Sequence, residues 1–383
     1  MPSILINPRI RTINARCVSN EKWDFFACPI NYEYVIRMQK IYSLQYLRAF
    51  AALWVLLTHV LQQCNVRPGG VFWAGQWGVD IFFLLSGFII CLTTKEGSSW
   101  VDFSIKRIFR IYPAYLLILF LYILYGIDVN VNACSSSSMC GGGRYLDIIY
   151  NILMLPMNGP ISTKSLIVGQ AWSTVFELYF YSLFALLLCT KASKRYIVHL
   201  IILLCIVGYG YRLVGFPVTG AWGFFSSVMG SKHVFFFIEG VLLAICHEKR
   251  WLNKVKIPLF LTVFAIIMLA YIWSMIDTYN QFQSFVLSPC VFIGILLLND
   301  YVRCESIWNR TLSFCGDISF SIYLVHLLII RIIMNEAGVD NVYVVAVLSL
   351  VLTLLASAVI YLLIEKRFID YAKQLINQRN LNK

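Results

Sequence analysis

Long apolar runs restrict the fold of this chain more than any other feature. Eleven of them follow the polar first forty residues, at about 44–63, 77–94, 111–127, 145–156, 166–190, 196–214, 233–247, 257–276, 284–300, 312–331 and 342–364. A helix needs about 20 apolar residues to cross the hydrocarbon core of a bilayer, and most of these runs approach that length. A hydrophobic content of 60% and a mean hydropathy of +0.74 exclude an ordinary soluble domain. The sequence therefore predicts an all-α, polytopic integral membrane protein.

One of the runs is too short to cross, and this decides the expected topology. The run at 145–156 ends at Pro156, so we expect a re-entrant or interfacial helix there and ten transmembrane crossings elsewhere. Most of the 31 Lys and Arg residues then fall on the side of both termini, which the positive-inside rule makes cytoplasmic. The net charge of +12 is accordingly interpreted as a topology signal, and no nucleic-acid partner is predicted.

The chain divides into one membrane domain and two tails. Residues 1–40 are polar and lack the apolar segment of a signal peptide. Met38 is an alternative start that would leave the membrane domain intact. Residues 41–370 form the predicted membrane domain, and 371–383 a cytoplasmic tail. No internal repeat or appended soluble domain is apparent in the sequence.

The twelve cysteines predict no metal centre, since they are scattered and match no metal-ligand spacing or disulfide framework. Cys134 and Cys140 lie in the Ser/Gly-rich segment 128–144, which the topology places outside the membrane. In that oxidising space they either form a disulfide or remain two free thiols.

Ionisable side chains inside membrane spans are costly and therefore mark functional sites. Those inside or near the apolar runs are Arg48, His59, Asp80, Glu177, Glu239, Asp317 and His326. Arg48 and His59 are eleven positions apart and share one helix face, roughly 16 Å apart along the axis. His59, Glu177 and His326 fall in the central-to-outer half of the bilayer, which predicts a shared polar pocket. The alternative is that a backbone carbonyl satisfies each His separately.

Two further motifs allow both a functional and a structural interpretation. Arg107 and Arg110, at the cytoplasmic start of their span, are spaced i, i+3 and would lie on one helix face. They would either clamp a phosphate with forked donors or serve as ordinary positive-inside anchors. The Ser86-Gly87 pair indicates close helix packing, since nothing near Ser86 in the sequence supplies the base that a nucleophile needs.

Taken together, six segments resemble the membrane acyltransferase type 3 family. They are LRAFAALWVLLTH, WGVDIFFLLSGFII, KRIFRIYPAYL, AWSTVFELYFYSLFALL, CGDISFSIYLVHLLI and LIEKRFI, and they occur in family order over roughly residues 38 to 370. The resemblance is closest to members that modify exopolysaccharide or O-antigen and carry no hydrolase domain. It implies an O-acyltransferase of the bacterial inner membrane that moves an acyl group from cytoplasmic acyl-CoA, usually acetyl-CoA, to a glycan hydroxyl, on an acceptor that is lipid-linked or free.

The resemblance also implies roles for particular residues. A neutral imidazole is well matched to removing the proton of an attacking alcohol near pH 7, so His59 is the expected base. Glu177 would orient that imidazole and stabilise its cation. Arg107 and Arg110 would bind the phosphates of CoA, and Arg48 would lie along the pantetheine arm. The remaining expected substrate-pocket residues are Asp80, Tyr323 and His326.

Two rival functions fit ten spans with buried charges. A secondary transporter of a glycan precursor would be expected to show matching halves and interrupted helices, and no matching halves are apparent. It would also give no reason for an Arg-x-x-Arg at the cytoplasmic mouth. A scaffold component of a glycan assembly complex would tolerate replacement of His59.

We therefore predict that His59→Ala yields a folded, membrane-inserted protein that transfers no acyl group, because the base is lost while the span remains apolar. Glycan ester content measured in cells that express the variant tests this. Normal acylation would refute the base assignment.

Overall fold

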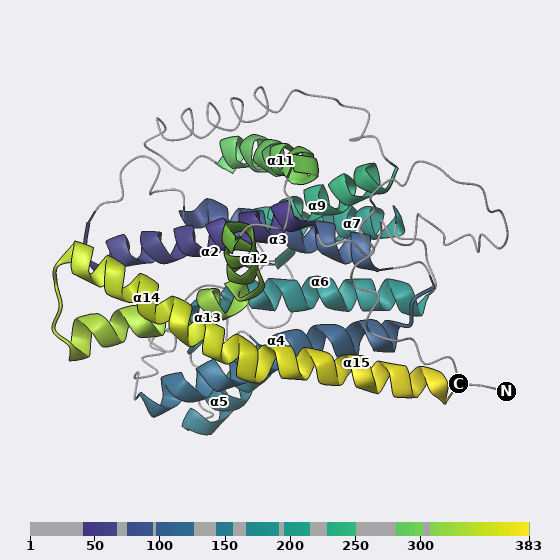
Figure 1. The fold of residues 1–383 in the computed structure, drawn as a ribbon. Helices are drawn as coiled ribbons and strands as arrows, with labels where there is room; N and C mark the ends of the chain where they lie inside the picture. The colour runs from purple at the N-terminus through teal and green to yellow at the C-terminus, as the bar shows by residue number, and fades with distance from the viewer. Residues whose placement is uncertain are drawn as a thin grey trace, which may run out of the picture. The chain divides into compact units, whose positions relative to one another are not determined.

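The described part of the chain is built from helices. The computed structural model describes residues 41–66, 75–94, 97–125, 143–155, 166–190, 195–214, 228–249, 281–301 and 307–382. Its α-helices are α2 (Tyr42–Gln63), α3 (Gly75–Thr93), α4 (Trp100–Leu124), α5 (Gly143–Ile152), α6 (Trp172–Cys189), α7 (Arg195–Leu213), α9 (Lys232–Glu248), α11 (Gln281–Leu297), α12 (Ile307–Asp317), α13 (Ser319–Arg331), α14 (Val342–Ile360) and α15 (Lys366–Leu381) (Figure 1). The N-terminal tail 1–40, the cysteines Cys134 and Cys140 and the run at 257–276 lie outside the described residues.

Five helical segments within the described ranges are long and apolar enough to cross a membrane. They are Tyr42–Gln63, Trp100–Leu124, Gly169–Cys189, Ser319–Glu336 and Val342–Leu381. This agrees with the prediction of an all-helical membrane protein. The short apolar run corresponds to α5, which has only 10 residues and would extend about 15 Å, half of a hydrocarbon core.

Helices α3 and α9 pack closely together, and two glycines allow it. A Cβ atom on Gly87 of α3 would overlap the carbonyl oxygen of Phe237, and one on Gly240 of α9 would overlap that of Leu84. Small residues let helix backbones approach closely within a membrane, where no hydrophobic force drives them together. The predicted packing role of Gly87 is thus confirmed.

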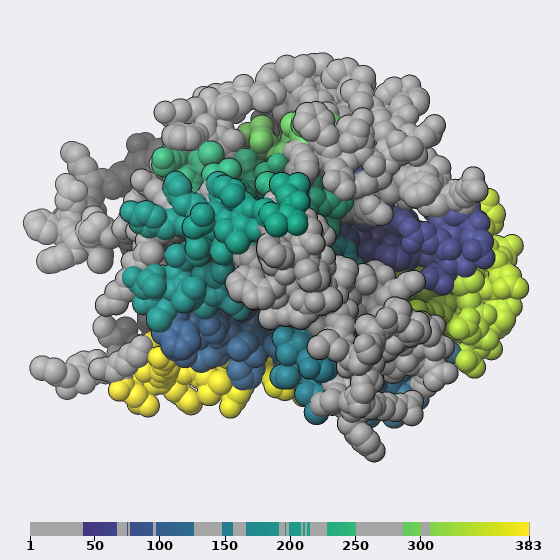
Figure 2. All heavy atoms as spheres, turned by 180° about the vertical axis from the view of Figure 1, so that it is seen from behind, coloured from purple at the N-terminus to yellow at the C-terminus, as the bar shows by residue number. Residues whose placement is uncertain are grey.

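The C-terminal third of the structure contains one continuous helical rod. α14 passes through a π-helical turn, Tyr361–Glu365, directly into α15 (Figure 1). α15 lies against α4, which also contacts α6 (Figure 2). Arg379 Nη1 donates a hydrogen bond to Asp102 Oδ1 at 3.1 Å and so ties the end of α15 to the start of α4.

These contacts bring the polar ends of several helices together. α2 contacts α3 and α13, and α4 contacts α6 and α13. The first half of α2 carries Arg48 and the first half of α4 carries Arg107 and Arg110. Apolar side chains from the same helices fill the surrounding core.

We predict that Gly87→Ala destabilises the protein by about 2 kcal/mol, because the new methyl group must push α3 and α9 apart. Gly210→Ala on α7 is the matched control, since a Cβ there meets nothing within 4 Å and alanine favours a helix over glycine. Thermal unfolding of the purified proteins in detergent compares them. Equal Tm values for the two variants would contradict the close-packing role of Gly87.

Candidate active site

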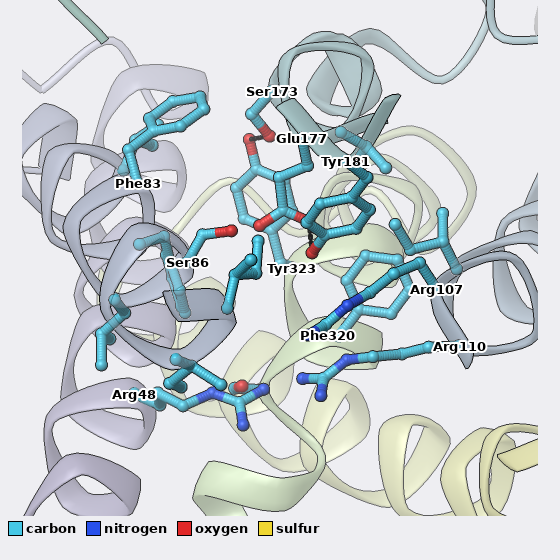
Figure 3. Close-up of a pocket in the computed structure, with 18 residues that line it drawn as sticks. Arg48, Phe83, Ser86, Arg107, Arg110, Ser173, Glu177, Tyr181, Phe320 and Tyr323 are labelled. Atoms are coloured by element: carbon cyan, nitrogen blue, oxygen red, sulfur yellow. Dashed lines mark hydrogen bonds between the residues drawn. The ribbon is translucent and has the colours of Figure 1, made fainter. Parts of the chain in front are cut away.

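A cavity of about 80 Å³ lies where α2, α3, α4, α6 and α13 meet (Figure 3). Since a site for one water needs about 10–15 Å³ by this measure, the cavity can hold several waters or a group of phosphate size. Its polar lining comprises Arg48, Ser86, Arg107, Arg110, Ser173, Thr174, Glu177, Tyr181, Ser319 and Tyr323.

Three arginines from two helices face this cavity. Arg107 and Arg110, three residues apart on α4, share a face as predicted, and the guanidinium group of Arg48 on α2 points toward that of Arg110 (Figure 3). Arg48 is only 9% exposed. Cations gathered in a buried site repel one another unless anions offset them. The electrostatic neighbours of Arg48 include Asp317, Glu177 and Glu365 as well as Arg110.

Arg107 is held in a defined orientation by aromatic rings. Its guanidinium carbon lies 5.1 Å from the ring centroid of Phe103 and 5.2 Å from that of Tyr181, within the range of cation–π attraction. Arg107 Nη2 also donates a hydrogen bond to Thr93 Oγ1 at 3.4 Å. These contacts hold the guanidinium group of Arg107 at the edge of the cavity.

Glu177 projects from α6 into the same cavity (Figure 3). The hydroxyl of Tyr181, one helical turn later, donates a hydrogen bond to Glu177 Oε2 at 3.3 Å. The expected contact between Glu177 and His59 is not formed. His59 is bonded instead to Val55 and to His326, and neither histidine is among the residues that line the cavity. Glu177 and the two histidines therefore do not share the single pocket that was predicted for them.

The two histidines form a pair between α2 and α13. His326 Nε2 lies 3.2 Å from His59 Nδ1, and the ring centroids are 4.9 Å apart. Each ring also meets the carbonyl oxygen one turn earlier in its own helix, His59 at Val55 and His326 at Ile322. The alternative of backbone-satisfied histidines is thus correct for one nitrogen of each ring. His326 is completely buried, whereas His59 is partly exposed.

Tyr323 connects the cavity to the histidine pair. It lines the cavity, and its ring centroid lies 5.9 Å from that of His326. Its hydroxyl donates to the carbonyl oxygen of Gln170 and accepts from Ser173 Oγ, both at 2.9 Å. The side chain of Gln170, in the short 3-10 turn Gly169–Ala171 before α6, donates to the carbonyl oxygen of Leu324. No signal in the sequence indicated this buried network, because Gln170 is neutral and lies at a helix start.

Asp80 does not line the cavity, although the sequence predicted a place for it in the substrate pocket. It is fully buried on α3 beside two residues of α9, 3.5 Å from Lys232 Nζ and 3.3 Å from His233 Nδ1. His233 in turn stacks on Phe83 at a centroid distance of 4.8 Å. The local role of Asp80 is therefore to join α3 to α9.

Glu365 is an acidic residue near the site that the sequence analysis did not select. It lies in the π-helical turn between α14 and α15, is 3% exposed, and accepts a hydrogen bond from Ser321 Oγ of α13. π-Turns shift a helix face and frequently occur at functional sites. The signal in the sequence was an acidic residue inside LIEKRFI, at the end of the last apolar run.

Comparison with known proteins places the chain among acyltransferases. A family model described as an acyltransferase domain matches residues 41–362. An O-acetyl transferase of Shigella phage Sf6 is 23% identical over 84% of the chain and 94% of its own length. The exopolysaccharide production protein ExoZ of Rhizobium meliloti is 26% identical over 70% of the chain and 80% of its own length. The acyltransferase MdmB of Streptomyces mycarofaciens is 29% identical, but the match spans only 39% of this chain and 40% of that protein. No solved structure matches the chain.

We predict that Tyr323→Phe destabilises the protein by about 1–2 kcal/mol, because the aromatic ring stays while two buried hydrogen bonds are lost. Tyr343→Phe on α14 is the control, since Tyr343 is 79% exposed. Thermal unfolding in detergent should show a lower Tm for Tyr323→Phe and an unchanged Tm for Tyr343→Phe. An unchanged Tm for Tyr323→Phe would show that its hydroxyl bonds do not hold α13 to α6.

Proposed function

Because the chain belongs to the membrane acyltransferase type 3 family, we propose that it transfers an acyl group, in the first instance acetyl, from acyl-CoA to a hydroxyl of a bacterial surface glycan such as an O-antigen or exopolysaccharide. The family match supports acyl transfer. The names of two relatives, an O-acetyl transferase and an exopolysaccharide production protein, support a polysaccharide acceptor. The observation that carries the donor assignment is the convergence of Arg48, Arg107 and Arg110 on one cavity.

CoA suits a site with three guanidinium groups because its charge resides in phosphates. Arginine presents a planar fork of donors that fits phosphate oxygens, and these charge-assisted hydrogen bonds are stronger than neutral ones. A cavity of about 80 Å³ accommodates one phosphate-sized group, so the rest of the donor extends beyond it. Glu177 and Glu365 then serve to space and balance the guanidinium groups when the donor is absent.

The proposed topology puts this cavity toward the cytoplasm, where acyl-CoA is made. The protein crosses the inner membrane ten times with both termini in the cytoplasm, so α2 and α4 both begin on that side. Arg48 and His59, in opposite halves of α2, are separated by roughly 16 Å along the helix. The pantetheine arm extends from the arginines toward the histidine pair and carries the thioester to His59.

The reaction at His59 conserves atoms and charge. The imidazole takes the proton of the acceptor hydroxyl. The hydroxyl oxygen of the acceptor attacks the thioester carbonyl carbon at the same time. The new C–O bond forms, the C–S bond breaks, and the departing thiolate receives the proton from the imidazolium. The products are a glycan ester and free CoA. General-base assistance of this kind contributes about 10²–10⁴-fold to the rate.

The identity of acyl group and acceptor is tested by mass spectrometry of surface polysaccharide from cells with and without the gene. We expect the polysaccharide of the deletion strain to lack an ester-linked acetyl group. A different mass difference between the two strains would identify another acyl group. Unaltered surface glycans, together with transport of a glycan precursor by the purified protein in vesicles, would refute the proposed transferase activity.

The donor site is tested by replacing both cavity arginines of α4. We predict that Arg107→Ala with Arg110→Ala raises the apparent KM for acyl-CoA at least about tenfold, because two phosphate ligands are lost. Lys106→Ala is the matched control, since Lys106 is exposed on the same helix and does not line the cavity. Thiol release by membranes supplied with acetyl-CoA measures the effect. Equal KM values in the double variant and the control would return the arginines to the role of membrane anchors.

A further inference from the structure

We propose that His326 is a positioning residue that fixes the tautomer of His59 and so makes Nε2 of His59 the atom that accepts the substrate proton. This inference rests on the proposed role of His59 as the base. It assigns to a second histidine the orienting function that the sequence had suggested for Glu177.

The positions of the carbonyl groups determine where the protons lie. A carbonyl oxygen only accepts hydrogen bonds, and a neutral imidazole has one N–H and one lone pair. His326 Nδ1 is 3.2 Å from the carbonyl oxygen of Ile322, so Nδ1 carries the proton and Nε2 carries the lone pair. That lone pair faces His59 Nδ1 at 3.2 Å.

His59 Nδ1 is therefore surrounded by two acceptors. The carbonyl oxygen of Val55 lies 2.9 Å away, and His326 Nε2 completes the pair. A proton on Nδ1 satisfies both in a bifurcated hydrogen bond. The single lone pair of neutral His59 then resides on Nε2, as proton abstraction requires.

The opposite assignment is disfavoured by repulsion. If His326 Nε2 carried the proton and donated to a bare His59 Nδ1, both Nδ1 atoms would direct lone pairs at carbonyl oxygens. Only one of the three contacts would then be a hydrogen bond, and two buried polar contacts would be repulsive. The first assignment makes all three contacts attractive.

The same arrangement stabilises His59 after it has taken the proton. In the imidazolium the Nδ1–H bond becomes a charge-assisted donor to Val55 and His326, which strengthens both contacts. His326 is completely buried, and a second positive charge beside the first would be strongly unfavourable. It therefore remains a neutral acceptor, while His59, which is partly exposed, is the histidine that substrate can reach.

Two nearly isosteric substitutions separate this role from simple packing. In His326→Gln the amide oxygen can take the place of Nε2 as an acceptor, whereas in His326→Met a thioether of similar size accepts poorly. The assay uses membranes that contain each full-length variant, acetyl-CoA, and polysaccharide isolated from cells lacking the gene. We expect His326→Met to lower kcat at least about tenfold with the KM for acetyl-CoA unchanged, and His326→Gln to recover most of that loss.

Folding of each His326 variant is checked before the rates are compared. Size-exclusion profiles in detergent verify folding. Should the Met variant not accumulate, His326→Asn replaces it, because the shorter amide lies near the Nδ1 position and does not reach His59.

The outcomes distinguish this inference from the function on which it rests. Equal activities of the Gln and Met variants would overturn the positioning role while leaving His59 as base. Full activity of His59→Ala would instead refute the base, and the positioning role with it.

Discussion

The cost of burying charge in a membrane-embedded interior dominates this structure. Three guanidinium groups converge on one cavity, and their mutual repulsion is acceptable only with carboxylates nearby or an anion bound. Asp317 at the end of α12, Glu177 on α6 and Glu365 in the π-turn meet that requirement as electrostatic neighbours of Arg48. The helices that supply these residues are consequently held in fixed relation, since moving any one of them would leave a buried charge without compensation.

A second, weaker constraint holds the histidine pair in place. The histidine pair needs no charge to keep its geometry when no substrate is bound. That geometry depends on hydrogen bonds to the carbonyl oxygens of Val55 and Ile322. Tyr323 stands between the pair and the arginine cavity and is itself held by Gln170 and Ser173. The arginine cavity and the histidine pair are thus two separate environments.

Several residues of the candidate site could be predicted because helical periodicity and the cost of intramembrane charge are local properties. The i, i+3 spacing of Arg107 and Arg110 correctly indicated a shared face, and Gly87 correctly indicated close packing. The pairing of Glu177 with His59 was wrong, because depth along a span does not say which neighbour a side chain faces. The predicted place of Asp80 in the substrate pocket was also wrong. Its carboxylate lies beside Lys232 and His233 of α9, because a buried carboxylate needs a nearby positive or hydrogen-bonding partner.

The sequence by itself determined the helical membrane class, the family and the set of costly polar residues, since each follows from composition, run length and short motifs. Only the tertiary structure decided that the histidines pair with each other, that the arginines gather around Glu177, and that a π-turn brings Glu365 inward. The physical reason is that these contacts join residues far apart in the chain. Their formation depends on how whole helices are rotated and packed, which a one-dimensional pattern of hydropathy does not encode.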